Sequence, residues 1–160
     1  MLKFTTLAVL AVAIAGMLPV AAARAAGPDD AAVRAANEQF YQALNAMFTG
    51  DIAPMEQVWS HADDVTYMGP DGKFLVGWSD VSANWTKQAG LKLGGEIREE
   101  NVQMKVGTDL ATVECREVGE NLVDGKATPV SLRATNVYRK ENGQWRMIGH
   151  HTDKLPFLEK

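Results

Sequence analysis

The chain has 160 residues, of which 46% are hydrophobic, and a chain of this length predicts one domain with a single core. Its formal net charge is −4, so it lacks the basic face that neutralises phosphates, and nucleic acid is excluded as an expected partner. The one cysteine, Cys115, excludes an internal disulfide, so the fold must depend on its core.

The first 25 residues have the pattern of a signal peptide. Lys3 gives a positive start, an apolar run follows, and Ala23-Arg24-Ala25 places small residues at the two positions that a signal peptidase reads. We expect cleavage after Ala25, a mature domain over residues 26–160, and a periplasmic or secreted protein that has no membrane contact after cleavage.

The alternative for this leader is an uncleaved membrane anchor, because the apolar run is nearly long enough to span a bilayer. Gly16 and Pro19 interrupt the run, which favours the signal peptide. Cleavage would remove Lys3 and Arg24 and leave 14 basic against 20 acidic groups, a net charge of −6.

Two helices are predicted at the start of the mature chain. Asp29 and Asp30 can cap the first helix, and Gly50 ends it. Apolar residues between them recur at spacings of three and four, as one buried stripe does: Val33, Ala36, Phe40, Leu44 and Met47. Asp51 then caps a second, shorter helix with Pro54 in its first turn.

The next segment predicts a small hairpin and a third helix. Short strands over residues 65–68 and 73–76 flank the turn Gly69-Pro70-Asp71-Gly72, and Ser79 or Asp80 opens the helix. One face of this helix collects Trp78, Val81, Trp85 and Ala89. A tryptophan stripe of this kind is typical of a core, and less often of a ligand pocket.

Four antiparallel strands are predicted from Glu96 onward, with reversals at Thr108-Asp109, Asp124-Gly125 and Asn142-Gly143. If each reversal is a two-residue turn, the register follows, and directly opposed residues must share a face. The predicted inner rows are Val106, Ala111, Tyr138 and Met147; Met104, Val113, Asn136 and Gly149; Val102, Cys115, Ala134 and His151; and Glu100, Glu117, Leu132 and Asp153. The opposite face is mostly charged.

The order of these elements, helices first and sheet last, predicts an α+β fold: a strongly bent antiparallel sheet wrapped round helices that enclose a pocket. The inner face is apolar apart from a few polar groups at one end, which is the usual description of a small-molecule site. We expect a small, largely apolar molecule as the ligand. Its predicted pocket is lined by Tyr67, Trp78, Trp85, Val113, Cys115, Asn136, Tyr138 and Met147.

The candidate catalytic residues are His151, Glu117 and Asp153. A histidine beside a carboxylate can act as a general acid or base, because its unperturbed pKa lies near neutrality and the carboxylate can fix its tautomer. Glu100 opposite Glu117 would form a like-charge pair, which tends to keep one of them protonated. His150 is predicted to point to the other face. No cofactor and no metal are expected, since the spacing of His and Cys residues does not match a zinc site.

Three stretches resemble the nuclear transport factor 2-like superfamily, and most closely its SnoaL-like and ketosteroid-isomerase-like branch. They are FYQALNAMFTGD over residues 40–51, the segment over residues 59–77 with DDVTY and GPDG, and the closing NGQWRMIGHHT. The resemblance covers residues 29–156 and implies a cone of strongly bent sheet closed by three helices, usually as a homodimer. Glu114, Arg116, Arg133 and Arg139 would lie on the outer face where the two copies meet.

The resemblance also implies that this chain lacks some of the site residues of the family. The catalytic aspartate of the steroid isomerases would fall at Gly69, and the tyrosine of their oxyanion hole near Ala43. The closing motif also resembles the association domain of calcium/calmodulin-dependent kinase, whose pocket arginine would fall on Asn136. The leading expectation is therefore an exported small-molecule-binding domain. The alternatives are an isomerase- or cyclase-like acid/base enzyme that uses His151 with a carboxylate, and a non-catalytic dimerisation module.

Overall fold

The structure is a computed structural model that describes residues 27–153. The signal peptide predicted over residues 1–25 lies outside the described residues. Between Gly27 and Asp153, no helix is both long enough and apolar enough to cross a membrane.

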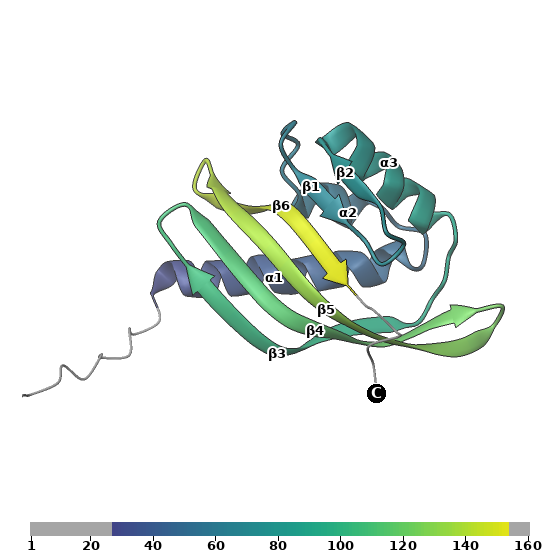
Figure 1. Cartoon of the computed structure of the whole chain (residues 1–160). Coiled ribbons are helices and arrows are strands. Elements are labelled where there is room, and N and C mark those ends of the chain that lie inside the picture. Colours follow the sequence, from purple (N-terminus) through teal and green to yellow (C-terminus); the bar gives the residue numbers. More distant parts are fainter. Residues whose placement is uncertain (1–26, 154–160) are drawn as a thin grey trace, which may run out of the picture.

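Three helices and six strands make up the described part of the chain. In order they are α1 (Pro28–Met47), α2 (Ala53–Val58), β1 (Thr66–Met68), β2 (Phe74–Val76), α3 (Trp78–Ala89), β3 (Glu96–Val106), β4 (Leu110–Val123), β5 (Lys126–Glu141) and β6 (Gln144–Asp153). The order of elements predicted from the sequence is confirmed. Figure 1 shows α1 running across the inner face of the long strands, with α3 and the β1–β2 hairpin at one end.

Local sequence explains where the helices begin. Pro28 stands at the first position of α1, where a missing amide hydrogen costs nothing, and the Asp30 carboxylate accepts a hydrogen bond from the Gly27 amide at 2.7 Å. At α2, the Asp51 side chain accepts a hydrogen bond from the Ala53 amide at 3.1 Å. The apolar stripe of α1 is buried and faces the sheet.

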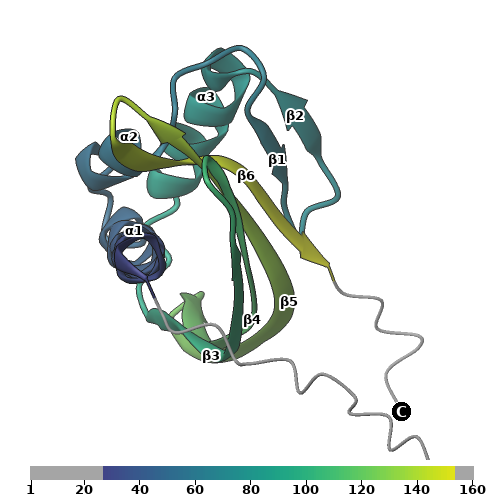
Figure 2. The ribbon, with the colours of Figure 1, turned by 90° about the vertical axis from the view of Figure 1, so that its left-hand side faces the viewer.

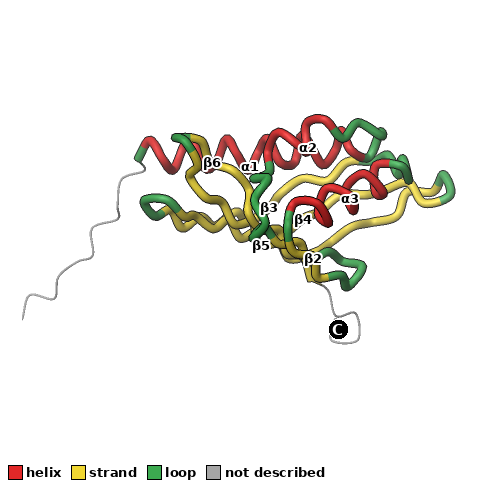
Figure 3. The backbone as a smooth tube through the Cα atoms, turned by 90° about the horizontal axis from the view of Figure 1, so that it is seen from above, coloured by secondary structure: helices red, strands yellow, loops and turns green. Residues whose placement is uncertain are grey.

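The sheet is curved and open, with strand order β2-β1-β6-β5-β4-β3. Strands β3 to β6 form an antiparallel meander, as predicted, but β1 pairs with β6 in parallel, so the sheet as a whole is mixed. Figure 2 shows α1 nearly end-on beside the curved strands. Figure 3 shows, from above, α3 alongside α1 with the strands beneath them, so the helices cover one face of the sheet.

All three predicted reversals are two-residue turns. Residues Asp124 and Asn142 have positive φ angles, each followed by a glycine with positive φ, which is the backbone of the type I′ hairpin. The register next to the turns is as predicted: Ala111 opposes Val106 and Tyr138, and Tyr138 opposes Met147.

Two β-bulges then shift the register by one residue, and both change which side chains face inward. In β6, Val137 opposes Gly149 while Tyr138 opposes Met147, so the intervening Ile148 is an extra residue. In β3 the shift falls between Glu100 and Gln103, and Asn101 there has φ of +56°. On the bulged strands, β3 and β6, every side chain beyond the bulge points to the face opposite to the predicted one.

The last three predicted rows of the inner face are therefore wrong in β6, and the last row is also wrong in β3. Asn136 opposes His150 instead of Gly149, Ala134 opposes Thr152 instead of His151, and Arg133, on the outer face, opposes Asp153. Glu117 opposes Glu99 instead of Glu100. The inner face of the bent end thus receives Glu99, His150 and Thr152.

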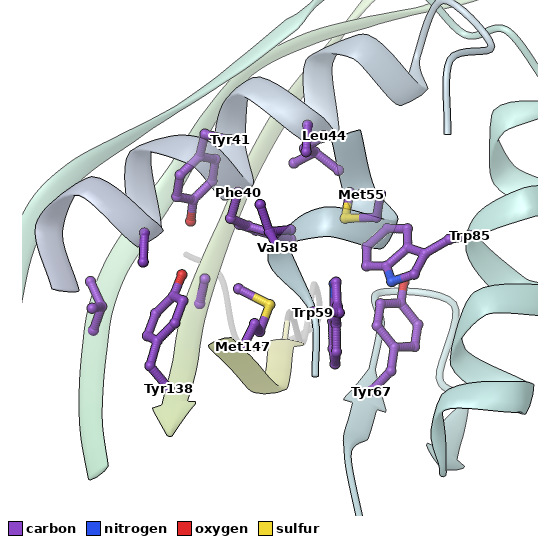
Figure 4. Packing of buried hydrophobic residues seen from close by; sticks show 14 of the residues in the cluster. Phe40, Tyr41, Leu44, Met55, Val58, Trp59, Tyr67, Trp85, Tyr138 and Met147 are labelled. Atoms are coloured by element: carbon purple, nitrogen blue, oxygen red, sulfur yellow. The ribbon is translucent and has the colours of Figure 1, made fainter. Parts of the chain in front are cut away.

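The core lies between the helices and the inner face of the sheet. Figure 4 shows Phe40 and Leu44 of α1, Met55 of α2, Tyr67 of β1 and Trp85 of α3 converging on it. Two of its aromatic pairs pack edge to face, with ring centroids 4.9 Å apart for Tyr67 and Trp85 and 5.1 Å apart for Phe40 and Tyr41.

The outer face of the sheet carries charged pairs. Lys105 binds Glu114 at 2.7 Å, and Arg133 binds Asp153 at 2.8 Å, all with exposed side chains. Exposed pairs of this kind contribute little to the stability of one subunit. The homodimer across this face stays a prediction.

Candidate functional site

A cavity of about 290 Å³ lies at the bent end of the sheet, between the ends of α1 and α3 and the inner face of β4, β5 and β6. Most of its lining is aliphatic or aromatic, and a few polar side chains converge on it, which suits a small-molecule site. The lining residues are Leu44, Phe48, Tyr67, Pro70, Trp85, Gln88, Leu93, Ile97, Glu117, Asn121, Pro129, Val130, Ser131, Leu132, His150 and Thr152.

His150 is the buried histidine of this cavity. Its side chain is 4% exposed and packs against the rings of Phe40, Tyr67 and Trp85, with centroids 4.9, 5.8 and 6.1 Å away. Burial lowers the pKa of His150 to about 3, and the charge of the adjacent His151 adds to this effect. The imidazole is therefore neutral at physiological pH.

Glu117 of β4 faces His150 across 3.9 Å, measured from the Oε1 oxygen to Nε2. Burial raises the pKa of Glu117 to about 7; the Tyr41 hydroxyl, which donates to Oε1 at 3.1 Å, opposes the shift, and Glu99 adds to it. The distance of 3.9 Å is too long for a hydrogen bond. Burial thus favours a neutral imidazole beside a carboxylic acid over a buried ion pair.

A chain of buried amides connects His150 to a second carboxylate. The His150 Nδ1 atom lies 2.7 Å from Asn136 Oδ1, and Asn136 Nδ2 donates to Asn37 Oδ1 at 2.8 Å. Asn37 Nδ2 in turn donates to the Glu99 carboxylate, and Tyr138 donates to Asn37 Oδ1 at 2.9 Å. Figure 4 shows the hydroxyl groups of Tyr41 and Tyr138 pointing toward one another from α1 and the sheet.

The structure does not place His151 and Asp153 in this cavity. His151 is exposed on the outer face, and Asp153 is paired with Arg133 there. The predicted triangle of His151, Glu117 and Asp153 is therefore wrong in its geometry, because it assumed a regular β6 and the bulge at Ile148 exchanges the positions of the two histidines. Of the three, Glu117 alone lines the cavity.

The predicted lining residues fall into three groups. Tyr67 and Trp85 line the cavity, whereas the others lie deeper in the core or the amide chain: Val113, Cys115, Asn136, Tyr138 and Met147. Trp78 lies apart from them, stacked on the ring of His61 with centroids 4.4 Å apart. Burial raises the pKa of the Cys115 thiol to about 11, so this residue is an unreactive member of the core.

The positions that correspond to steroid-isomerase residues hold no catalytic group. A Cβ atom added to Gly69 would lie 2.1 Å from the Tyr67 hydroxyl oxygen, so the Tyr67 ring fills the space of a side chain at residue 69. Ala43 is 1% exposed in the core. Acid or base chemistry in this cavity would therefore depend on His150 and Glu117.

A second, wider groove of about 650 Å³ lies between α1, α2 and the β5–β6 hairpin. It is lined by polar surface residues such as Gln39, Gln57 and Gln144 and does not contain the buried titratable pair. Among residues 27–153, no group of three or more His, Cys, Asp or Glu side chains is arranged to hold a metal ion.

The bent mixed sheet, the three helices on its inner face and the cavity at its bent end define the nuclear transport factor 2-like fold. A family model of the SnoaL-like domain matches residues 33–153, so the chain belongs to the SnoaL-like family of that superfamily.

Solved structures with the same fold have been assigned different functions. A candidate calcium/calmodulin-dependent protein kinase type II association domain from Thiobacillus denitrificans is 30% identical, with a TM-score of 0.66 over 76% of this chain and 94% of that one. A candidate dehydratase of the NTF2-like family from Streptomyces avermitilis is 24% identical, with a TM-score of 0.70 over 80% and 97%. A candidate ketosteroid isomerase from Shewanella frigidimarina is 19% identical, with a TM-score of 0.64 over 79% and 98%.

One curated relative is a plant protein. The F-box protein SKIP8 from Arabidopsis thaliana is 26% identical over 101 residues, which are 63% of this chain and 41% of that protein. The chain thus matches less than half the length of that relative. A fold shared by such different proteins does not identify a reaction.

Four residues of the buried polar network beside the cavity were missed from the sequence: His150, Glu99, Asn37 and Tyr41. Glycine inside a predicted strand is a signal of a bulge, and Gly149 stands beside the register shift in β6. Asn101, beside the shift in β3, is of a residue type that tolerates the positive φ it adopts there. Asn37 and Tyr41 follow Val33 at intervals of four, so they continue the buried stripe of α1.

Proposed function

We propose that this protein binds a small, largely apolar molecule that carries one hydrogen-bonding group. The observation that carries the proposal is the 290 Å³ cavity whose apolar lining is interrupted by His150 and Glu117. A buried polar group without a partner is unfavourable, so a ligand that bonds to this pair gains affinity and orientation there. Membership of the SnoaL-like family supports the proposal at the level of small-molecule binding.

The first prediction uses two adjacent histidines, one buried in the cavity and one exposed outside it. We expect His150→Ala to weaken binding of a probe such as 4-propylphenol by roughly tenfold or more, the size of one lost hydrogen bond to a buried group. His151→Ala is the matched control and should bind like the wild type. Protein-observed NMR should report binding through the side-chain N–H signals of Trp85 and Gln88, which line the cavity.

Two outcomes would contradict the proposal. Binding that perturbs Trp145 but leaves Trp85 and Gln88 unchanged would place the ligand in the second groove, which Trp145 lines. Equal loss of affinity in the two histidine variants would remove His150 from the site. Native mass spectrometry of the protein from its own host adds a direct search for a retained ligand.

A second candidate function is proton transfer, as in an isomerase-like enzyme that uses Glu117 beside His150. The specific observation is that a carboxyl group with a pKa of about 7 faces an apolar cavity, 3.9 Å from a neutral imidazole. The Glu117 carboxylate could take a proton from the carbon beside a carbonyl, because its pKa suits a general base near neutral pH, whereas the lowered pKa of His150 makes the imidazole a weak base. The Glu117 carboxylic acid would then return a proton to that carbon and restore the carboxylate.

This candidate predicts exchange of carbon-bound hydrogen. In D₂O the wild type should incorporate deuterium beside the carbonyl of 4-propylcyclohexanone, and Glu117→Gln should lower that rate by roughly 100-fold or more, the usual contribution of a general base. His151→Ala should exchange at the wild-type rate. If the ketone binds in the cavity without any enzyme-dependent exchange, the domain is a binding protein and not an isomerase of this kind.

A further inference from the structure

We propose that the cavity selects neutral molecules that donate a hydrogen bond, such as phenols and alcohols, and that Glu99, Asn37 and Asn136 are the positioning residues that impose this selectivity. The inference deepens the proposed binding function and rests on it. It follows from the direction of the hydrogen bonds in the amide chain behind His150, which is fixed from its far end.

Glu99 sets the donor-to-acceptor direction of the hydrogen bonds in the amide chain. Burial and the charge of Glu38 raise the pKa of Glu99, whereas Arg34 and the Asn37 amide oppose that shift. In its ionised form the carboxylate only accepts hydrogen bonds, so Asn37 turns its Nδ2 group toward Glu99. Asn37 Oδ1 then faces inward, where it accepts from the Tyr138 hydroxyl at 2.9 Å and from Asn136 Nδ2 at 2.8 Å. Both of these hydrogen bonds require the same orientation of the Asn37 amide, with Oδ1 facing inward.

The orientation of the Asn136 amide in turn fixes the tautomer of the His150 imidazole. Since Asn136 uses Nδ2 toward Asn37, its Oδ1 atom faces His150 and accepts from Nδ1 at 2.7 Å. Nδ1 must therefore carry the hydrogen of the neutral ring, and Nε2 keeps a free lone pair. A charge on β3 thus fixes which tautomer of a histidine on β6 meets the cavity.

An Nε2 lone pair determines what a ligand must offer. Nε2 lies 3.9 Å from Glu117 Oε1, which is too far for a direct hydrogen bond. A hydroxyl group can donate to Nε2 and at the same time accept from the Glu117 carboxylic acid. An ether lacks the donor and leaves Nε2 unpaired.

Anions are disfavoured for a separate reason. Among the cavity-lining residues that the structure describes, none is Lys or Arg, while Glu117 is one of them and Glu99 lies behind the amide chain. A bound carboxylate would be desolvated without a counter-charge and would face two acidic groups. The site should therefore reject it.

Three probes of one shape separate these requirements: 4-propylphenol, 4-propylanisole and 4-propylbenzoate. At about pH 6 we expect the phenol to bind roughly tenfold more tightly than the anisole, the difference expected for one buried hydrogen bond, and the benzoate to bind more weakly still. The ¹⁵N shifts of the labelled imidazole should show the hydrogen on Nδ1 of His150, with the signals assigned by their loss in His150→Asn.

Glu99→Gln tests the positioning residues. A glutamine can present either its oxygen or its amide nitrogen to Asn37, so the chain loses its fixed direction. We expect mixed tautomers of His150 and a smaller preference for the phenol over the anisole. Glu100→Gln is the matched control, because Glu100 lies at the next position of β3 and pairs with Arg98 at the surface. It should leave both measurements unchanged.

Each failure has a distinct meaning. A hydrogen on Nε2 of wild-type His150, or equal affinity for phenol and anisole, would overturn the inference and leave small-molecule binding intact. Unchanged tautomer and preference in Glu99→Gln would remove the role of the amide chain. If none of the three probes perturbs Trp85 or Gln88, the inference and the proposed binding function fail together.

Discussion

Replacing Asn37 with Ala should lower the free energy of unfolding by roughly 3–5 kcal/mol, because each buried polar group left without a partner costs about 1–3 kcal/mol. Asn37 is 1% exposed and satisfies three groups at once: the Glu99 carboxylate, Asn136 Nδ2 and the Tyr138 hydroxyl. Urea denaturation of the variant measures the change. A loss smaller than about 1 kcal/mol would mean that these groups find other partners.

Two further variants separate this explanation from a general effect of changing α1. Glu38→Ala, at the next position of the helix, removes an exposed side chain and should change stability by no more than roughly 0.5 kcal/mol. In the double variant Asn37→Ala with Glu99→Ala the carboxylate is no longer left unpaired. Its loss should therefore be smaller than the sum of the two single losses.

The fold could be predicted because its signals are local. Helix caps, the apolar stripe of α1 and the Asp-Gly and Asn-Gly turns each act within a few residues, and together they determine the order of elements and the register near each turn. The cavity end of the sheet lies beyond both bulges, so the register that the turns imply no longer holds there.

The prediction of the site residues relied on the register that the turns imply. One extra residue at Ile148 brings His150 inward and His151 outward, and the shift near Asn101 does the same for Glu99 and Glu100. Gly149 signals the first bulge, since its position has Val137 and Thr66 atoms within 3.5 Å of an added Cβ. The partners of Asn37 could not be predicted, because they lie on β3 and β5 and the helix sequence alone does not identify them.

Folding should move a proton from His150 to Glu117 without net uptake between about pH 4.5 and 6.5. The pKa of Glu117 rises from 4.5 to about 7 on burial, so between these values the folded chain holds one proton more and the Glu117 contribution to stability falls as pH rises. The pKa of His150 falls from 6.5 to about 3, so there the unfolded chain holds one proton more and the His150 contribution rises with pH. In the shared window the two contributions cancel.

Single variants should reveal the separate contributions of Glu117 and His150 to the pH dependence of stability. Relative to the wild type, Glu117→Gln should gain roughly 3 kcal/mol of stability as pH rises from about 4.5 to 7, at about 1.4 kcal/mol per pKa unit. His150→Asn, which keeps a donor for Asn136, should gain roughly 4–5 kcal/mol as pH falls from about 6.5 to 3.

Urea denaturation across this pH range gives both differences. Glu99 is present in all of these proteins, so most of its titration is common to the curves that are compared, and the exposed Glu100→Gln variant should run parallel to the wild type throughout. The two slopes have opposite signs because each group, once its partner is replaced, is neutral in the folded chain and charged in the unfolded chain through most of the shared window. Curves for Glu117→Gln and His150→Asn that both run parallel to the wild type between pH 4.5 and 6.5 would therefore mean that the pair stays charged when buried. In that case Nε2 would carry a hydrogen, and the cavity would offer a donor where we expect an acceptor.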